Sequence, residues 1–255
     1  MKNVTADDHF EAARIATAAG ELLLSIRDEM SSRGADSREM KDVGDEQSHL
    51  FIMEELRRVR PDDAILSEEG KDDLARLDAD RIWIVDPVDG TREFSEPPRT
   101  DWAVHVAMVI DGEPVVGAVA LPALGITLST AEPPVIPEVG ATPPRMIVSR
   151  TRPPAAATLV AEQLGAELVE MGSAGAKAMS VVRGESEMYA HSGGQYEWDS
   201  CAPAAVALAA GLHVSRADGS PMTYNHADPY LPDLLICRKE YAEDALRVLA
   251  EAEAD

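Results

Sequence analysis

The sequence predicts a mixed fold, of α+β type in its first half and α/β type in its second. In the first half, two helical patterns precede apolar runs separated by turns; in the second, short apolar runs alternate with helical patterns. Five prolines between residues 133 and 144 separate the halves. We therefore expect an N-terminal lobe over 1–132 and a C-terminal lobe over 145–255, although these prolines would also suit a surface loop inside one domain.

The first half is expected to open with two helices. Residues 7–30 carry apolar side chains at mainly three-to-four spacing, namely Phe10, Ala13, Ala16, Leu23, Ile26 and Met30. Residues 45–60 carry Leu50, Met53, Leu56 and Val59 at spacing three, and Pro61 ends this helix. Strands are predicted next, at 64–70, 81–85, 102–110, 115–122 and 125–130. The Asp111-Gly112 turn predicts a hairpin, so this sheet should be largely antiparallel.

The second half predicts an alternation of strands and helices. The predicted strands lie at 146–149, 166–171, 186–191, 213–215 and 233–238. The predicted helices lie at 154–164, 174–183, 199–210 and 240–252. This alternation is typical of an α/β lobe.

The charge of the chain limits its partners. Its 255 residues carry a formal net charge of −23, which repels nucleic acid and anionic membrane surfaces. Small phosphorylated anions are repelled too, unless a bound cation supplies local positive charge. The two cysteines, Cys201 and Cys237, lie in apolar segments without metal-type spacing and are interpreted as core residues in a reducing compartment. Since no run reaches transmembrane length, a cytoplasmic protein is expected.

The stretch IVDPVDGTREF (84–94) carries the first chemical signal. Asp86 and Asp89 follow a buried apolar run, and two carboxylates there are costly unless something offsets their repulsion. Mg²⁺ does so, because it prefers hard oxygen ligands. Pro87 stiffens the turn between the acids, and the carbonyl of Val88 is a third candidate oxygen ligand. The alternative interpretation is an Asp-rich turn with a helix cap.

The two residues after Asp89 suit an anion. Gly90 allows close backbone approach, and Thr91 offers a hydroxyl and an amide where a helix is expected to begin. Phosphatases of the haloacid dehalogenase type also place D-G-T near a strand end, but they require Asp two residues before the second aspartate. Pro87 occupies that position, so an aspartyl-phosphate mechanism is not supported.

Two further acidic sites lie elsewhere in the chain. Glu68 and Glu69 follow a predicted strand, and since strand neighbours point oppositely we expect Glu68 to face the metals. Asp199 lies in the first turn of an Ala-rich helix, where it is also a good cap. His105 and His213 lie in strand-like segments and are interpreted as core or edge residues.

Three segments stand in the order and approximate spacing of known signature motifs: LSEEG (66–70), DPVDGT (86–91) and WDSCAPAAV (198–206). With them the chain resembles, over nearly its whole length, the inositol-monophosphatase-like superfamily of Mg²⁺-dependent, lithium-sensitive phosphatases. The resemblance implies a layered αβαβα sandwich of the inositol monophosphatase and fructose-1,6-bisphosphatase type. It also implies two or three Mg²⁺ ions held by Glu68, Asp86, Asp89, Asp199 and the carbonyl of Val88.

The resemblance assigns catalytic roles as well. Thr91 and Asp45 would pair to aim the attacking water and accept its proton. Asp45 stands where the second helix is expected to begin, so its alternative role is a plain cap. The amides of Gly90 and Thr91 would cradle the phosphate, and Ser173 and Gly175 would bind near the sugar and its phosphate.

The closer resemblance is to the 3′-phosphoadenosine-5′-phosphate phosphatases of this superfamily. DPVDGTREF (86–94) has their DGT-[KR]-EF form, and MGSAGAKAM (171–179) resembles their GS-x-G-x-K segment. Residues 74–108 and GGQYEWDS (193–200) are similar to mycobacterial and actinobacterial members. Many members have Tyr-Pro-Arg where this chain has Tyr-Ala-His at 189–191, so the second phosphate would meet His191 or Lys177. A solvated helix lysine is the alternative for Lys177.

The implied activity is hydrolysis of 3′-phosphoadenosine 5′-phosphate, and of 3′-phosphoadenylyl sulfate, by direct in-line attack of water. Inositol 1-phosphate or fructose 1,6-bisphosphate are the alternative substrates on the same fold. An acidic metal- or ligand-binding protein without catalysis is the alternative of another class, and Thr91 with Asp45 argues against it. The expected partner is a small phosphorylated nucleotide, with no nucleic acid or membrane. Family members are often dimers, which leaves a homodimer open.

Overall fold

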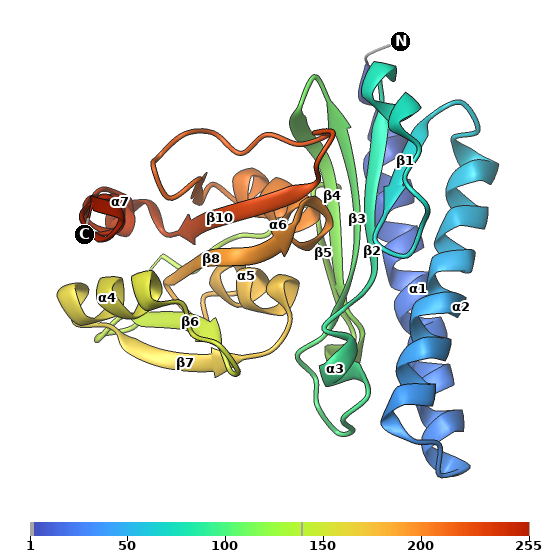
Figure 1. Cartoon of the computed structure of the whole chain (residues 1–255), viewed down its shortest axis with the longest axis horizontal. Coiled ribbons are helices and arrows are strands. Elements are labelled where there is room, and N and C mark those ends of the chain that lie inside the picture. Colours follow the sequence, from blue (N-terminus) through green and yellow to red (C-terminus); the bar gives the residue numbers. More distant parts are fainter. Residues whose placement is uncertain (1–2, 139, 255) are drawn as a thin grey trace.

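Two five-stranded sheets carry the chain, and helices lie on both sides of each (Figure 1). The computed structural model describes residues 3–138 and 140–254. The first sheet contains β1 (Ala64–Ser67), β2 (Ile82–Asp89), β3 (Ala103–Ile110), β4 (Glu113–Leu121) and β5 (Ile126–Ser129), in that spatial order. Its pairs are antiparallel except β1 with β2, which are parallel. The predicted sheet is confirmed, with one parallel edge that the sequence did not indicate.

The second sheet has the spatial order β7, β6, β8, β10, β9. Its strands are β6 (Arg145–Ser149), β7 (Glu167–Met171), β8 (Met188–Tyr196), β9 (His213–Ser215) and β10 (Tyr230–Cys237). The helices are α1 (Ala6–Ser32), α2 (Ser37–Val59), α3 (Thr91–Phe94), α4 (Ala155–Leu164), α5 (Ala174–Val182), α6 (Glu197–Ala209) and α7 (Lys239–Ala254). Short 3₁₀ turns lie at Leu74–Asp78 and Pro122–Leu124.

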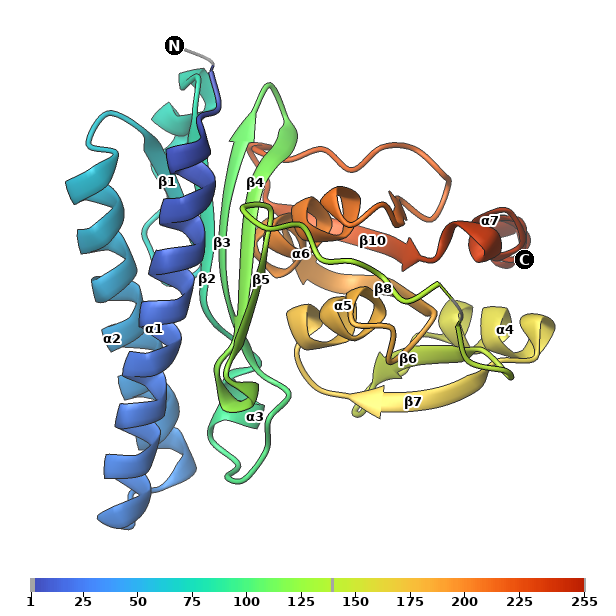
Figure 2. The same ribbon diagram turned by 180° about the vertical axis from the view of Figure 1, so that it is seen from behind.

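Five layers follow one another across the molecule, as Figures 1 and 2 show from opposite sides. Helices α1 and α2 cover the outer face of the first sheet, α5 and α6 lie between the sheets, and α4 and α7 cover the second sheet. Three apolar clusters fill the contacts between layers: one under α1 and α2, one on both sides of α5 and α6, and one under α4 and α7. Along β2, Trp83 faces α1 and α2 while Ile84 faces α5 and α6, which explains why the strand is apolar on both sides. The predicted αβαβα sandwich is confirmed.

The central cluster takes residues from both halves of the chain, such as Ile84 and Val206. The proline-rich segment 133–144 lies between the two sheets in sequence. The division into lobes over 1–132 and 145–255 therefore stays a prediction. Residues 1, 2, 139 and 255, which belong to these predicted lobes or their boundary, lie outside the described part of the chain.

The helix patterns were partly wrong. Helix α2 begins at Ser37, with Asp36 as its cap, whereas the sequence analysis started it at Asp45. Phe10 and Leu50 were predicted on the buried faces, yet they are exposed. Small residues mark the buried faces of the helices instead. At Gly44, for example, α2 packs so closely on α3 that an added Cβ would lie 2.5 Å from the Phe94 ring. Cys201 and Cys237 are buried and unpaired, as predicted.

Candidate metal centre and active site

The aspartates of the DPVD segment lie inside β2 rather than after it. Asp86 pairs with His105 of β3 and Asp89 with Ala103, so three steps along β2 match two along β3. This is a one-residue bulge around Pro87, which has no N–H to contribute to the ladder. In a regular strand, residues three apart face opposite sides of the sheet. The bulge turns both aspartates to the side that faces α5 and α6.

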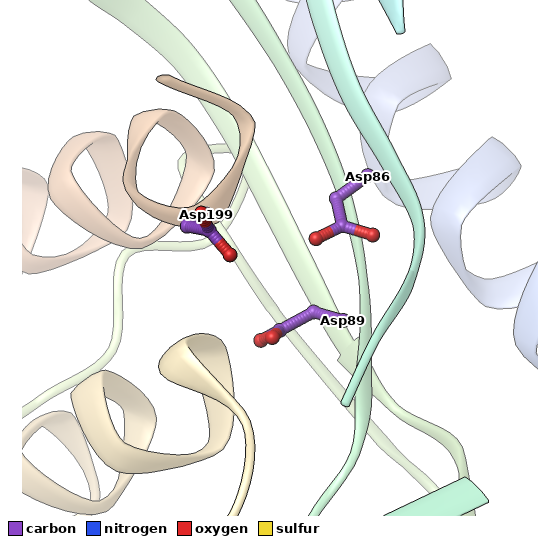
Figure 3. Close-up of side chains that lie close together, drawn as sticks. All are labelled: Asp86, Asp89 and Asp199. Atoms are coloured by element: carbon purple, nitrogen blue, oxygen red, sulfur yellow. The ribbon is translucent and has the colours of Figure 1, made fainter. Parts of the chain in front are cut away.

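Asp199 reaches the same place from the second half of the chain. It lies in the first turn of α6, where its Oδ2 accepts a hydrogen bond from the N–H of Tyr196 at 2.7 Å. One carboxylate oxygen from each of Asp86, Asp89 and Asp199 lies within 4.8 Å of the other two. Figure 3 shows the three side chains converging from β2 and α6. Hard oxygen ligands at this spacing suit a divalent cation such as Mg²⁺.

Glu68 extends the cluster from β1. Ser67 pairs with Val85 in the parallel ladder, and the N–H of Glu68 donates to the carbonyl of Val85 at 3.3 Å. Glu68 therefore runs beside Asp86, and each carboxyl affects the pKa of the other.

The electrostatics of the cluster favour a bound cation. Burial raises the pKa of Asp86 well above its usual range, and Glu68, Asp89 and Asp199 add to the effect. Burial, reinforced by neighbouring acids, also raises the pKa of Glu68 to about 7 and that of Asp199 to about 7. These acids resist ionising together without a counter-ion. The donor set thus fits Mg²⁺, although the metal assignment of each residue stays a prediction.

Asp89 differs from its neighbours because hydrogen-bond donors surround it. Ser173 Oγ and the N–H of Gly175 donate to its Oδ2, both at 2.5 Å, and the N–H of Ala174 donates to Oδ1 at 3.0 Å. Burial alone would raise the pKa of Asp89, but His105 and these donors lower it to about 2. The carboxylate therefore stays charged at the N-terminus of α5.

His105 was missed as a site residue by the sequence analysis. It is fully buried, as predicted for a core residue, but its Nε2 lies 3.2 Å from Asp89 Oδ2. Its Nδ1 lies 2.9 Å from the carbonyl of Trp198, so Nδ1 carries the proton that this bond requires. Burial opposes a charged imidazole, but Asp89 outweighs it and raises the pKa of His105. His105 thereby links Asp89 to the backbone just before Asp199.

Asp45 of α2 and Thr91 of α3 lie near each other. Asp45 lies in the interior of α2, so the alternative role as the cap of this helix is wrong. The Thr91 hydroxyl donates to the carbonyl of Val88 at 3.1 Å, and Thr91 is also near enough to Asp45 to lower the pKa of that carboxyl in part. Burial first, then Glu69, raises the pKa of Asp45 to about 7. The catalytic roles of this pair stay predictions.

Gly90 is the cap before α3 and has a left-handed backbone conformation that favours glycine. Its φ is 82°, and an added Cβ would lie 2.9 Å from the Cβ of Ser173. The backbone of the DGT turn therefore packs directly on the loop before α5. The phosphate cradle predicted for the amides of Gly90 and Thr91 is not tested by this geometry.

The segment 172–177 lies at the site, with contacts that the sequence did not predict. Ser173 and Gly175 donate to Asp89, and their substrate contacts stay predictions. At Gly175 an added Cβ would lie 2.0 Å from His105 Nε2, so only glycine fits. Lys177 is 5% exposed and its Nζ donates to the carbonyls of Gly172 and Ser173, at 2.9 and 2.5 Å. The alternative of a solvated lysine is therefore wrong.

His191 lies on β8 and is mostly enclosed. Its Nε2 lies 2.9 Å from the carbonyl of Gly193. Burial, and then the charge of Lys177, lowers the pKa of His191 to about 4. The imidazole is neutral near pH 7 and brings no positive charge to a phosphate. Its predicted substrate contact stays a prediction, restricted to a neutral hydrogen bond.

These pKa shifts predict how Mg²⁺ stabilises the fold. Glu68 and Asp199 bind protons more tightly when folded than when unfolded, so the stability they contribute is present below about pH 4 and is lost as the pH rises to about 7. Divalent cations replace those protons. We expect the increase in Tm caused by Mg²⁺ to be larger at pH 7.5 than at pH 5.5 in thermal unfolding. The lowered pKa of Asp89 affects the stability of the fold only below about pH 4, outside this pH range. An increase independent of pH would contradict the account.

A protein-family model matches most of the chain. The model of the inositol monophosphatase family matches residues 7–133 and 145–253. A 3′-phosphoadenosine 5′-phosphate phosphatase of Mycobacterium leprae (strain TN) is 50% identical over 253 residues, covering 94% of this chain and 92% of that protein. The 3′(2′),5′-bisphosphate nucleotidase CysQ of Escherichia coli (strain K12) is 29% identical over 235 residues, covering 87% and 95%.

Solved structures have the same fold. CysQ from Bacteroides thetaiotaomicron has a TM-score of 0.74 at 28% identity, covering 92% of this chain and 97% of that one. An inositol monophosphatase from Anabaena has a TM-score of 0.72 at 22% identity, covering 95% of each chain. Within the described residues, no helix has both the length and the apolar character needed to cross a membrane.

Proposed function

Because the chain belongs to the inositol monophosphatase family, we propose that it is a Mg²⁺-dependent phosphatase acting on 3′-phosphoadenosine 5′-phosphate. It removes the 3′-phosphate and releases AMP and phosphate. The relatives that carry this activity, or that of a 3′(2′),5′-bisphosphate nucleotidase, in their names align with nearly the whole chain and support phosphatase activity. 3′-Phosphoadenylyl sulfate carries the same 3′-phosphate and is proposed as a second substrate.

One observation carries the proposal: Asp86, Asp89 and Asp199 place carboxylate oxygens within 4.8 Å of one another. Together with Glu68 and the carbonyl of Val88, they are the proposed ligands of two or three Mg²⁺ ions. When bound, Mg²⁺ neutralises phosphate charge and lowers the pKa of water. The donors from Ser173, Ala174 and Gly175 hold Asp89 in its charged form.

Asp45 and Thr91 are proposed to prepare the attacking water. A general base works best when its pKa lies near the working pH, and that of Asp45 is raised to about 7 by burial and by Glu69. Thr91 lies near this carboxylate and begins α3, directly after Gly90, whose amide is proposed to bind the phosphate. Direct in-line attack requires a correctly oriented water molecule, and it requires no nucleophile from the enzyme.

Arg152 is the cation we propose for the second phosphate. Two residues earlier, Arg150 bonds Glu93 and Glu96, at 2.6 and 2.8 Å, which places this end of β6 beside α3. The positive charge of Arg152 is also a minor cause of the lowered pKa of His191. Lys177 is engaged with two carbonyls, His191 is neutral and the exposed Arg92 of α3 is paired with Glu96, whereas Arg152 is a further exposed positive charge among the described residues of this region.

Arg152→Ala is expected to raise KM for 3′-phosphoadenosine 5′-phosphate by about tenfold, since a hydrogen bond to a charged group contributes about 1.5–3 kcal/mol. KM for a substrate with one phosphate should change little, because that phosphate lies at the carboxylate cluster. The measurement is steady-state kinetics on both substrates. Arg57→Ala, at an exposed arginine of α2, is the matched control. Equal increases of KM for both substrates would contradict the assignment.

A substrate panel tests the proposed function. Phosphate release is measured with Mg²⁺, with and without Li⁺, on the nucleotide, inositol 1-phosphate and fructose 1,6-bisphosphate. We expect the highest kcat/KM on the nucleotide and inhibition by Li⁺. A hundredfold preference for inositol 1-phosphate would overturn the choice of substrate. Undetectable turnover on every phosphomonoester would favour a metal- or ligand-binding protein.

A further inference from the structure

Three aromatic side chains gather beside Asp199, in a chain where aromatic residues make up only 4%. We call Tyr196, Trp198 and Tyr230 the aromatic platform. The rings of Tyr196 and Trp198 are stacked, with centroids 4.9 Å apart and planes at 9°, and Tyr230 meets Tyr196 edge-on at 5.9 Å. Most other aromatic side chains of the described residues are buried or partly buried in the apolar clusters.

The platform is exposed even though it is well ordered by its own contacts. Tyr196 is 41% and Tyr230 43% exposed. Trp198 stacks on one face of the Tyr196 ring, and both Tyr196 and Tyr230 stay exposed, so aromatic surface of the platform remains open. A flat ring surface of this kind is an aromatic stacking site without charged groups of its own.

The platform adjoins the carboxylate cluster along the chain. The N–H of Tyr196 donates to Asp199 Oδ2 at 2.7 Å, so the platform begins one hydrogen bond away from the carboxylate cluster. On its other side the chain turns through Gly193 and Gly194, both with positive φ, and the N–H of Gly194 donates to the Tyr230 hydroxyl at 3.3 Å. The platform therefore begins at the residue whose backbone N–H holds the Asp199 carboxylate.

We propose that the platform stacks against the purine base of the substrate. This inference rests on the proposed function and names the residues that distinguish a nucleotide from a sugar or inositol phosphate. Every nucleobase has a flat π face that stacks on aromatic side chains. A polyol instead needs several convergent hydrogen-bond groups, whereas the platform offers chiefly ring surface. Base stacking thus makes the enzyme prefer the nucleotide over a sugar or inositol phosphate, and no charged side chain has to contact the base.

Tyr196→Ala tests the stack, with Tyr196→Phe as the variant that keeps the ring. The measurement is kcat/KM with Mg²⁺ for 3′-phosphoadenosine 5′-phosphate and for glycerol 2-phosphate, which has no base. We expect the ratio between the two substrates to fall about tenfold or more in Tyr196→Ala, the size of effect typical for one lost base stack. The ratio should stay near the wild-type value in Tyr196→Phe and in Phe10→Ala, which removes an exposed ring of α1.

An unchanged ratio in Tyr196→Ala would overturn the proposal, whether both activities are retained or both fall together. AMP binding, followed by the fluorescence of Trp198, gives a readout that does not need turnover. Trp83 and Trp102 are fully buried, so Trp198 is the tryptophan placed to report the ligand. If the wild type binds AMP through the platform but does not hydrolyse the nucleotide, the proposed function fails while the stack stands. A shift from dimer to monomer in Tyr196→Ala, without weaker AMP binding, would assign the platform to a subunit contact and overturn the proposal.

Discussion

Asp89→Asn is expected to lower kcat/KM for phosphate release by at least about 10³-fold, because a bound metal contributes several kcal/mol of transition-state stabilisation and each 1.36 kcal/mol is tenfold. Asp89 is the member of the cluster that the protein itself keeps charged, through Ser173, Gly175 and His105. An amide at this position removes the charge and places an NH₂ group against donors. The measurement is kcat/KM at saturating Mg²⁺, with Mn²⁺ binding followed in parallel.

Asp62→Asn is the matched control, since Asp62 is exposed near the end of α2, outside the cluster. It should retain wild-type kinetics and metal binding. A kcat/KM for Asp89→Asn within tenfold of the wild type would exclude Asp89 as a ligand that catalysis requires. Circular dichroism separates this outcome from loss of folding.

Asp45→Asn is expected to lower kcat by about 10²–10⁴-fold, the usual contribution of a positioned general base, with little change in KM. The wild type should also lose kcat as the pH falls through about 7, because burial and Glu69 raise the pKa of Asp45 to about 7 and only the deprotonated form accepts a proton. In Asp45→Asn that acid limb should disappear. The measurement is the pH profile of kcat from pH 5.5 to 8.5.

Asp42→Asn, one helical turn earlier and exposed, is the control for this experiment. It removes a charge that contributes to the raised pKa of Asp45, so its acid limb should move slightly to lower pH while kcat at the plateau is retained. An Asp45→Asn enzyme with the wild-type profile would show that another group accepts the proton.

The sequence indicated Asp86, Asp89 and Asp199, which the structure brings together, but not how they meet. The DPVD spacing indicated a turn after a strand, whereas the two aspartates share a side through a bulge inside β2. The bulge depends on the register between β2 and β3. Residues distant in the sequence set that register, so no local sequence pattern reveals the bulge. His105 was missed for the same reason, since an isolated histidine in a strand gives no sign that it lies opposite Asp86.

Local patterns also misplaced Asp45, and they left the burial of Lys177 open. The apolar spacing of residues 45–60 hid the earlier start of α2 at its Asp36 cap, so Asp45 was expected at a helix start rather than in its interior. Lys177 stands in a helix whose exposure the sequence could not show, because α5 lies between two sheets only in the folded chain. The order of elements was predictable because apolar periodicity is local, but the burial of each charged group depends on the layer that covers it.

Anomalous diffraction from crystals of the protein soaked in Mn²⁺ tests the central claim most directly. The account predicts anomalous peaks between β2 and the first turn of α6, coordinated by Asp86, Asp89 and Asp199, with Glu68 and the Val88 carbonyl completing the set. Peaks only elsewhere, or these carboxylates turned away from a site without bound metal, would contradict it.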